Sequence, residues 1–139
     1  MTRLRILAAC AAALLSLTGC TDPTDDTYLP ALKQDPMAAW APAGAGTPTR
    51  TFEVGYRAGG TFEGKRRQAQ ILRIYTLPDD AAVTAAVAAG ITAAQAAGWT
   101  TTVTEGILTK PMAGTNAQLT ILHSTTTPRA ISISLTLIP

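Results

Sequence analysis

The clearest alternation of apolar and polar residues lies at the C-terminal end of the chain. Between residues 131 and 137 every second residue is Ile or Leu, and the residues between them are Ser or Thr. A period of two predicts a β-strand with one buried side and one side in water. Shorter runs of apolar and β-branched residues predict four further strands, at Thr51–Arg57, Gln68–Leu77, Thr100–Leu108 and Asn116–Ser124.

One stretch has the period of a helix instead. Ala81–Ala97 is rich in alanine, the strongest helix former, and four of its residues share one face: Val83, Val87, Ile91 and Ala94. Asp79 precedes the run and can cap its first N–H groups, and Gly98 follows it as a left-handed stop. We therefore expect a capped helix that covers a sheet. Its outer side carries no charge and is a candidate contact surface.

The order of these elements defines a fold class. Gly59-Gly60 is a turn signal that joins the first two strands as a hairpin. The chain then reads as two strands, one helix and three strands, which predicts an α+β fold. We expect a single domain over residues 50–139, a two-layer sandwich in which one helix covers one face of an antiparallel sheet of about five strands. Lys110–Gly114 is expected to be a loop.

The segment before this domain has a different composition. Residues 20–49 contain five prolines and several aspartates, which are typical of an extended, acidic tether. At about 3.1 Å per residue, such a tether could hold a domain tens of ångströms from its attachment point. Met37 and Trp40 are apolar residues that a tether does not need. We favour an N-terminal arm that packs on the domain over a docking segment for a partner.

The first 20 residues carry an export signal. Arg3 and Arg5 precede an apolar run, Ile6–Leu17, that suits a signal peptide and is short for a membrane-spanning helix. The run ends in Leu17-Thr18-Gly19-Cys20, which resembles the lipobox of bacterial surface lipoproteins. With its Ala- and Thr-rich, Lys-poor composition, the chain resembles small lipoproteins of actinobacteria. The resemblance implies that residues 1–19 are removed and that Cys20 is lipidated, which places the protein on the outer side of the cell membrane.

Processing would change the composition of the chain. The net charge of +2 comes from Arg3 and Arg5, so the mature chain is near neutral, which argues against nucleic acid as a partner. Of the two cysteines, Cys10 leaves with the signal peptide and Cys20 carries lipid. The mature chain then has no thiol for a disulfide or a nucleophile.

Candidate catalytic groups are few. His123 is the only histidine, so a site with several histidine ligands is impossible, and its sequence neighbour Ser124 would point to the other face of a strand. Glu53 and Glu63 could meet across the first hairpin as a pair of acids, but two such residues beside a Gly-Gly turn are more often in water. We expect no enzyme activity, no cofactor and no metal.

The most distinctive charged feature is the basic cluster of the first hairpin, formed by Arg57, Lys65, Arg66 and Arg67. Such a cluster can bind anionic lipid headgroups or wall polymers, or it can protect a sheet edge from aggregation. The sequence thus favours a lipid-anchored, non-enzymatic binding module of the cell envelope. The alternatives are an accessory subunit of an envelope complex, which would use the same surfaces, and an enzyme of unrecognised type.

Overall fold

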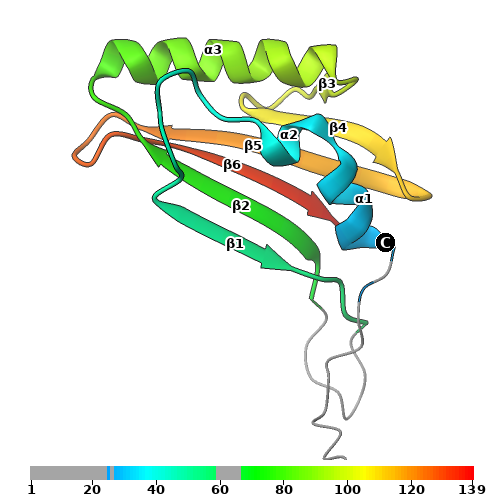
Figure 1. The fold of residues 1–139 in the computed structure, drawn as a ribbon. Helices are drawn as coiled ribbons and strands as arrows, with labels where there is room; N and C mark the ends of the chain where they lie inside the picture. Colours follow the sequence, from blue (N-terminus) through cyan, green and yellow to red (C-terminus); the bar gives the residue numbers. More distant parts are fainter. Residues whose placement is uncertain (1–24, 26, 59–66) are drawn as a thin grey trace, which may run out of the picture.

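The computed structural model describes residue 25, residues 27–58 and residues 67–139. This part of the chain forms one six-stranded antiparallel sheet with helices on one side (Figure 1). The strand order across the sheet is β1-β2-β6-β5-β4-β3. The strands are β1 (Arg50–Val54), β2 (Ala69–Thr76), β3 (Thr100–Thr101), β4 (Ile107–Met112), β5 (Thr115–Ser124) and β6 (Ala130–Leu137). The helices are α1 (Tyr28–Gln34), α2 (Pro36–Ala39) and α3 (Asp80–Ala96). The predicted α+β class and the antiparallel sheet are confirmed.

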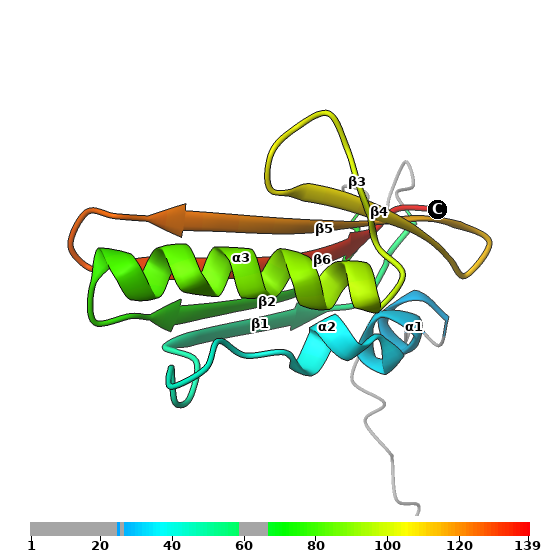
Figure 2. The ribbon, with the colours of Figure 1, turned by 90° about the horizontal axis from the view of Figure 1, so that it is seen from above.

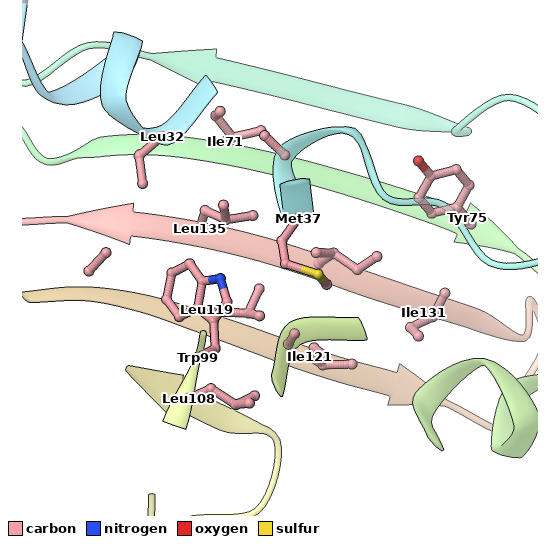
Figure 3. Close-up of a cluster of buried hydrophobic side chains, with 14 of the residues drawn as sticks. Leu32, Met37, Ile71, Tyr75, Trp99, Leu108, Leu119, Ile121, Ile131 and Leu135 are labelled. Atoms are coloured by element: carbon pink, nitrogen blue, oxygen red, sulfur yellow. The ribbon is translucent and has the colours of Figure 1, made fainter. Parts of the chain in front are cut away.

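The strand with the clearest alternation, β6, lies in the interior of the sheet. It pairs with β2 on one side and β5 on the other. Ile131, Ile133, Leu135 and Leu137 are all buried on the helix side, as the alternation predicts. These residues join the core shown in Figure 3, where side chains from β2, β4 and β5 meet Met37 of α2 and Trp99.

The long helix α3 begins and ends where its sequence signals lie. The Asp79 carboxylate accepts a hydrogen bond from the Ala82 N–H at 2.7 Å, and Gly98 has φ +88°. Gly90 faces the sheet and leaves little room for a side chain. A Cβ built there would lie 3.3 Å from Ile121 and 3.2 Å from the Trp40 ring. Figure 2 shows α3 running along the middle of the sheet.

The tether predicted for residues 20–49 is wrong between Tyr28 and Ala39, which form two helices, and residues 20–24 and 26 lie outside the described residues. α1 and α2 pack on the same side of the sheet as α3, beside it (Figures 1 and 2), and they bury Leu32 and Met37 almost completely. Proline is tolerated here because Pro30 lies in the first turn of α1 and Pro36 is the first residue of α2. The N-terminal arm is thus confirmed, and α3 is not the single covering helix.

The second half of the sheet differs from the prediction in two places. The expected strand Thr100–Leu108 is interrupted, because the chain turns between β3 and β4. The expected loop at Lys110–Gly114 is largely strand, since β4 runs on to Met112. Thr102 donates its N–H to the Ile107 carbonyl, so alternate residues of β4 from Ile107 onward direct their backbone groups away from β5. Pro111 is one of these, and beyond the short β3 it costs no ladder hydrogen bond.

Candidate functional site

The side of the sheet that faces away from α3 is not covered by any described element (Figure 1). We call this side the outer face. The cross-strand registers place on it the residues that alternate with the buried ones. In the four strands β2, β6, β5 and β4 these are Gln70, Leu72, Ile74, Thr76, Ala130, Ser132, Ser134, Thr136, Asn116, Gln118, Thr120, Leu122, Ser124, Ile107, Thr109 and Pro111.

None of these side chains is charged at neutral pH. Antiparallel sheets often turn a polar side to water, and such a side can carry ionised residues. Here the polar residues are Ser, Thr, Asn and Gln, whose dipoles cost much less to bury than an ion. The interior of protein interfaces is likewise depleted of charge. The part of the outer face formed by β2, β6, β5 and β4 can therefore be covered by a partner without burying an unpaired ion, whereas Arg50 of β1 lies beside it, opposite Ile74.

Two large apolar side chains stand out on this face. Phe52 of β1 is 47 % exposed and Leu122 of β5 is 57 % exposed. Phe52 lies opposite Leu72, and Leu122 and Ile74 flank Ser132 in register. A mainly apolar depression of about 240 Å³ adjoins this second group. The outer face thus combines hydrogen-bonding groups with exposed apolar anchors.

The opposite side of the molecule offers a second uncharged surface. The outward side of α3 after its first turn is made of Ala, Thr and Gln. It is convex and narrow, whereas the outer face spans the sheet. This helix surface remains a candidate contact surface, as predicted from the sequence, but it is narrower than the outer face of the sheet.

Half of the predicted basic cluster can be located. Arg57 and Arg67 face each other just beyond β1 and β2 and exchange both backbone hydrogen bonds, at 2.8 and 3.0 Å. Arg67 also donates from Nε to the Gly55 carbonyl at 3.1 Å. Lys65 and Arg66 lie outside the described residues. The structure therefore brings two of the four cations together at one end of the hairpin, and anion binding stays a prediction.

Near this end of the hairpin, the Asp25 carboxylate binds backbone groups of both α1 and the segment after β1. Asp25 accepts backbone hydrogen bonds from Thr27, Tyr28 and Leu29 at the start of α1, and from Tyr56 at 2.6 Å. Burial by itself raises the pKa of Asp25, but the four N–H groups outweigh it and leave this pKa below its ordinary value. Asp25 therefore joins α1 to the first hairpin as an ionised group.

The pair of acids proposed from the sequence is only half described. Glu63 lies outside the described residues. Glu53 forms ion pairs with Lys33 at 2.8 Å and Arg73 at 3.1 Å. The hydrogen bond from Lys33 holds the pKa of Glu53 below its ordinary value against the opposing effect of burial, and Arg73 adds to the lowering. Arg73 also donates to the Ala38 carbonyl at 2.7 Å, so Glu53 helps to attach α1 and α2 to the sheet.

His123 lies at the rim of the core. Its side of β5 is the helix side, yet the residue is exposed because it lies beyond the end of β4. With Glu105, Val87 and Ile91 it lines a shallow pocket beside α3. No catalytic arrangement around His123 is found among the described residues.

A buried polar cluster was missed by sequence reasoning. Asp35 is 5 % exposed. Its Oδ1 caps α2 by accepting the Met37 N–H at 2.9 Å and also accepts from Trp99 Nε1 at 3.1 Å. Its Oδ2 accepts from Lys110 Nζ at 2.7 Å, and the same ammonium donates to the Ala97 carbonyl at 2.7 Å. The Asp-Pro pair at residues 35 and 36 is a helix-start signal that could have revealed the cap, but not the two distant partners.

The cluster has a structural role in this arrangement. Lys110 lies at the C-terminal end of α3, where a cation is favoured by the helix dipole, and its ammonium is 5.8 Å from the centre of the Trp99 ring. The hydrogen bonds from Lys110 and Trp99 to Asp35, and from Lys110 to Ala97, therefore join α2, the end of α3 and β4.

Two further features concern the residues that the structure describes. Within residues 25, 27–58 and 67–139, no three His, Cys, Asp or Glu side chains are grouped so that they could hold a metal ion. No helix of that region is both long and apolar enough to cross a bilayer.

Comparison of the chain with protein-family models, curated proteins and solved structures finds no match.

Proposed function

We propose that this protein is a lipid-anchored module of the bacterial cell envelope that binds a partner and has no enzyme activity of its own. Anchoring would use Cys20, and the outer face of the sheet would be the binding surface. The observation that supports this proposal best is the outer face itself, which is broad, uncovered by described elements and free of charge across its four inner strands.

The chemistry of this face favours a protein partner. Its exposed Leu122 and Phe52 provide apolar anchors, and the Ser, Thr, Asn and Gln residues around them provide donors and acceptors. Interfaces between proteins combine an apolar centre with hydrogen-bonding groups in the same way. Arg57 and Arg67 lie at the end of the hairpin and could add contacts to an anionic lipid headgroup.

A charge placed on the outer face tests the binding surface. We expect Leu122→Arg and Gln118→Arg to abolish photo-crosslinking of the protein to its partner in native membranes, because each puts an ion into the proposed interface. Ala88→Arg, on the exposed side of α3, is the matched control and should leave crosslinking unchanged. Loss of the crosslinked product with Ala88→Arg but not with Leu122→Arg would move the binding surface to the helix.

The same membrane preparation distinguishes an accessory subunit from a binding module. A partner that copurifies in a fixed ratio would indicate an accessory subunit of an envelope complex, whereas a weakly held partner indicates a binding module. If no envelope component crosslinks to the wild-type protein, the proposed function is wrong.

The anchor is tested separately. Cys20→Ala should release the protein from the membrane fraction and prevent labelling with a palmitate analogue, because the acyl chains supply the membrane affinity. A Cys20→Ala variant that stays in the membrane fraction and labels as before would contradict the lipobox interpretation.

A further inference from the structure

The helix side of the sheet has a pocket that the proposed function does not use. It lies between α3 and the last residues of β5 and has a volume of about 200 Å³. An apolar cavity of about 150 Å³ can hold benzene, so this pocket can take a group of about that size. The lining residues that matter here are Val87 and Ile91 of α3, Ile121 and His123 of β5, and Glu105 and Gly106 before β4.

The pocket exists because β5 is longer than β4 at this end. The Gly106 carbonyl accepts the Ile121 N–H at 2.7 Å, and β5 then continues to Ser124 beyond the start of β4 (Figure 2). His123, two residues after Ile121, directs its own N–H and C=O toward the same open side of the strand. In the described part of the chain, nothing is bonded to these two backbone groups.

An apolar wall and a free carboxylate meet in this pocket. Val87 and Ile91 are one turn apart on the sheet-facing side of α3, and both pack beside the buried Ile121. Neither Glu105 nor His123 has an ion pair or a side-chain hydrogen bond within the described residues. A carboxylate without a cation of its own attracts a positively charged ligand and repels a negatively charged one.

The turn before β4 positions this carboxylate. Thr102 donates its N–H to the Ile107 carbonyl at 3.1 Å, and the Ile107 N–H is bound by the Thr104 carbonyl at 3.2 Å. These bonds close the loop that carries Glu105, and Gly106, with φ +74°, turns the chain toward β5. The backbone of Glu105 is therefore held beside β5 before a ligand arrives, which lowers the entropy cost of binding.

We propose that this pocket binds a small organic amine, with its apolar body against Val87 and Ile91 and its ammonium at Glu105. An ammonium has three N–H donors and no acceptor. The acceptors at the pocket are the Glu105 carboxylate, the His123 carbonyl and the unprotonated nitrogen of the His123 imidazole. The volume limits the apolar body to about one ring or a short alkyl chain. The site lies on the helix side of the sheet, so it does not depend on the proposed anchor or on the partner of the outer face.

Phenethylamine, whose ring and ammonium match the pocket, is the probe that tests the proposal. Its titration into the isotope-labelled full chain in nonionic detergent should shift the amide resonances of Gly106 and His123, and the shifts should saturate. Phenethyl alcohol has no charge and hydrocinnamate has the opposite charge, so each should bind at least about fivefold more weakly. Methylammonium, which lacks the apolar body, should give no saturable shift. If phenethylamine gives none at millimolar concentrations, the proposal is wrong.

Glu105→Gln tests which group binds the ammonium. Glu105 is exposed and its charge is partly screened by water, so we expect the affinity for phenethylamine to fall by about fivefold and that for phenethyl alcohol to stay unchanged. Glu53→Gln makes the same change at the β1 edge of the sheet and should leave both affinities unchanged.

Two results with these reagents would overturn the proposal. One is equal binding of phenethylamine to the wild type and to Glu105→Gln. The other is a saturable shift of Gly106 and His123 with a blocked lysine peptide but not with the free amine, which would make the pocket a contact site for a protein. Neither result depends on the crosslinking that tests the outer face, so the two proposals can fail separately.

Discussion

Removal of Lys110, which leaves the buried Asp35 carboxylate without its cation, should destabilise the protein far more than removal of a lysine from a surface ion pair. In Lys110→Met the Asp35 carboxylate, whose side chain is 1 % exposed, keeps its bonds from Met37 and Trp99 but loses its cation. Removal of one partner of a buried pair costs about 3–5 kcal/mol. Because the Lys110 side chain is 25 % exposed, we expect a loss near the lower limit, about 3 kcal/mol.

Urea denaturation, followed by Trp fluorescence and analysed by linear extrapolation, measures this loss as a change in the free energy of unfolding. A matched control is Lys33→Met, which breaks a pair whose lysine is 51 % exposed and should cost less than about 1 kcal/mol. Asp35→Asn keeps the cap of α2 but places an amide near the ammonium. The double variant Asp35→Asn, Lys110→Met should be more stable than the sum of the single effects predicts, by about 1–3 kcal/mol.

Two results would refute this reasoning. One is a loss for Lys110→Met no larger than that for Lys33→Met. The other is strict additivity in the double variant. Either result would mean that water replaces the ammonium at little cost and that the cluster does not join α2, α3 and β4 as a unit.

Two further predictions concern the N-terminal arm and the turns. The pKa values of Asp25 and Glu53 are lower in the folded state than in the unfolded state. Their stabilising effect is therefore complete above the unfolded pKa values, near pH 4, and is lost as the pH falls through the folded pKa values. The urea midpoint of the wild type should fall over this acidic range, and the midpoint of Asp25→Asn should fall less. Gly106→Ala should destabilise the protein far more than Gly114→Ala by the same urea assay. Both residues have positive φ, but a Cβ at Gly106 would lie 2.5 Å from the Ile121 carbonyl oxygen, whereas nothing lies within 4 Å of one at Gly114. Equal losses would show that backbone strain alone matters, at about 1–2 kcal/mol.

Local signals predicted the elements that depend on local chemistry. The alternation of β6, the cap at Asp79 and the stop at Gly98 lie within or beside the element that each defines, and all three are found in the structure. The predicted antiparallel pairing of the first two strands is also found, although the Gly59-Gly60 turn signal lies outside the described residues. In these regions local propensity and hydrophobic pattern agree, so the sequence is sufficient.

The errors occur where distant contacts decide the structure. α1 and α2 are too short to be stable by themselves, and they form because Leu32 and Met37 are buried against the sheet. The extent of β4 depends on where β3 ends, which determines whether Pro111 faces a partner strand. Asp35 and Lys110 are 75 residues apart in the chain, and no local pattern connects them.

The lack of charge on the outer face could be predicted from the alternating Ser and Thr of β6. The extension of this uncharged face over several strands could not be predicted, because it depends on the order of the strands in the sheet. Strands β2 and β6 are neighbours although more than 50 residues separate them in the sequence. Only this order brings Leu122 and Ile74 to either side of Ser132.

The hydrogen bond from the Tyr56 N–H to Asp25 would limit the distance between the domain and the membrane. Under the proposed anchoring, only five residue steps connect Cys20 to the first fixed point of the fold, and a chain of that length spans at most about 18 Å. The domain would then remain within a thin layer next to the headgroups, rather than tens of ångströms away. Partners would have to enter that layer to reach the outer face.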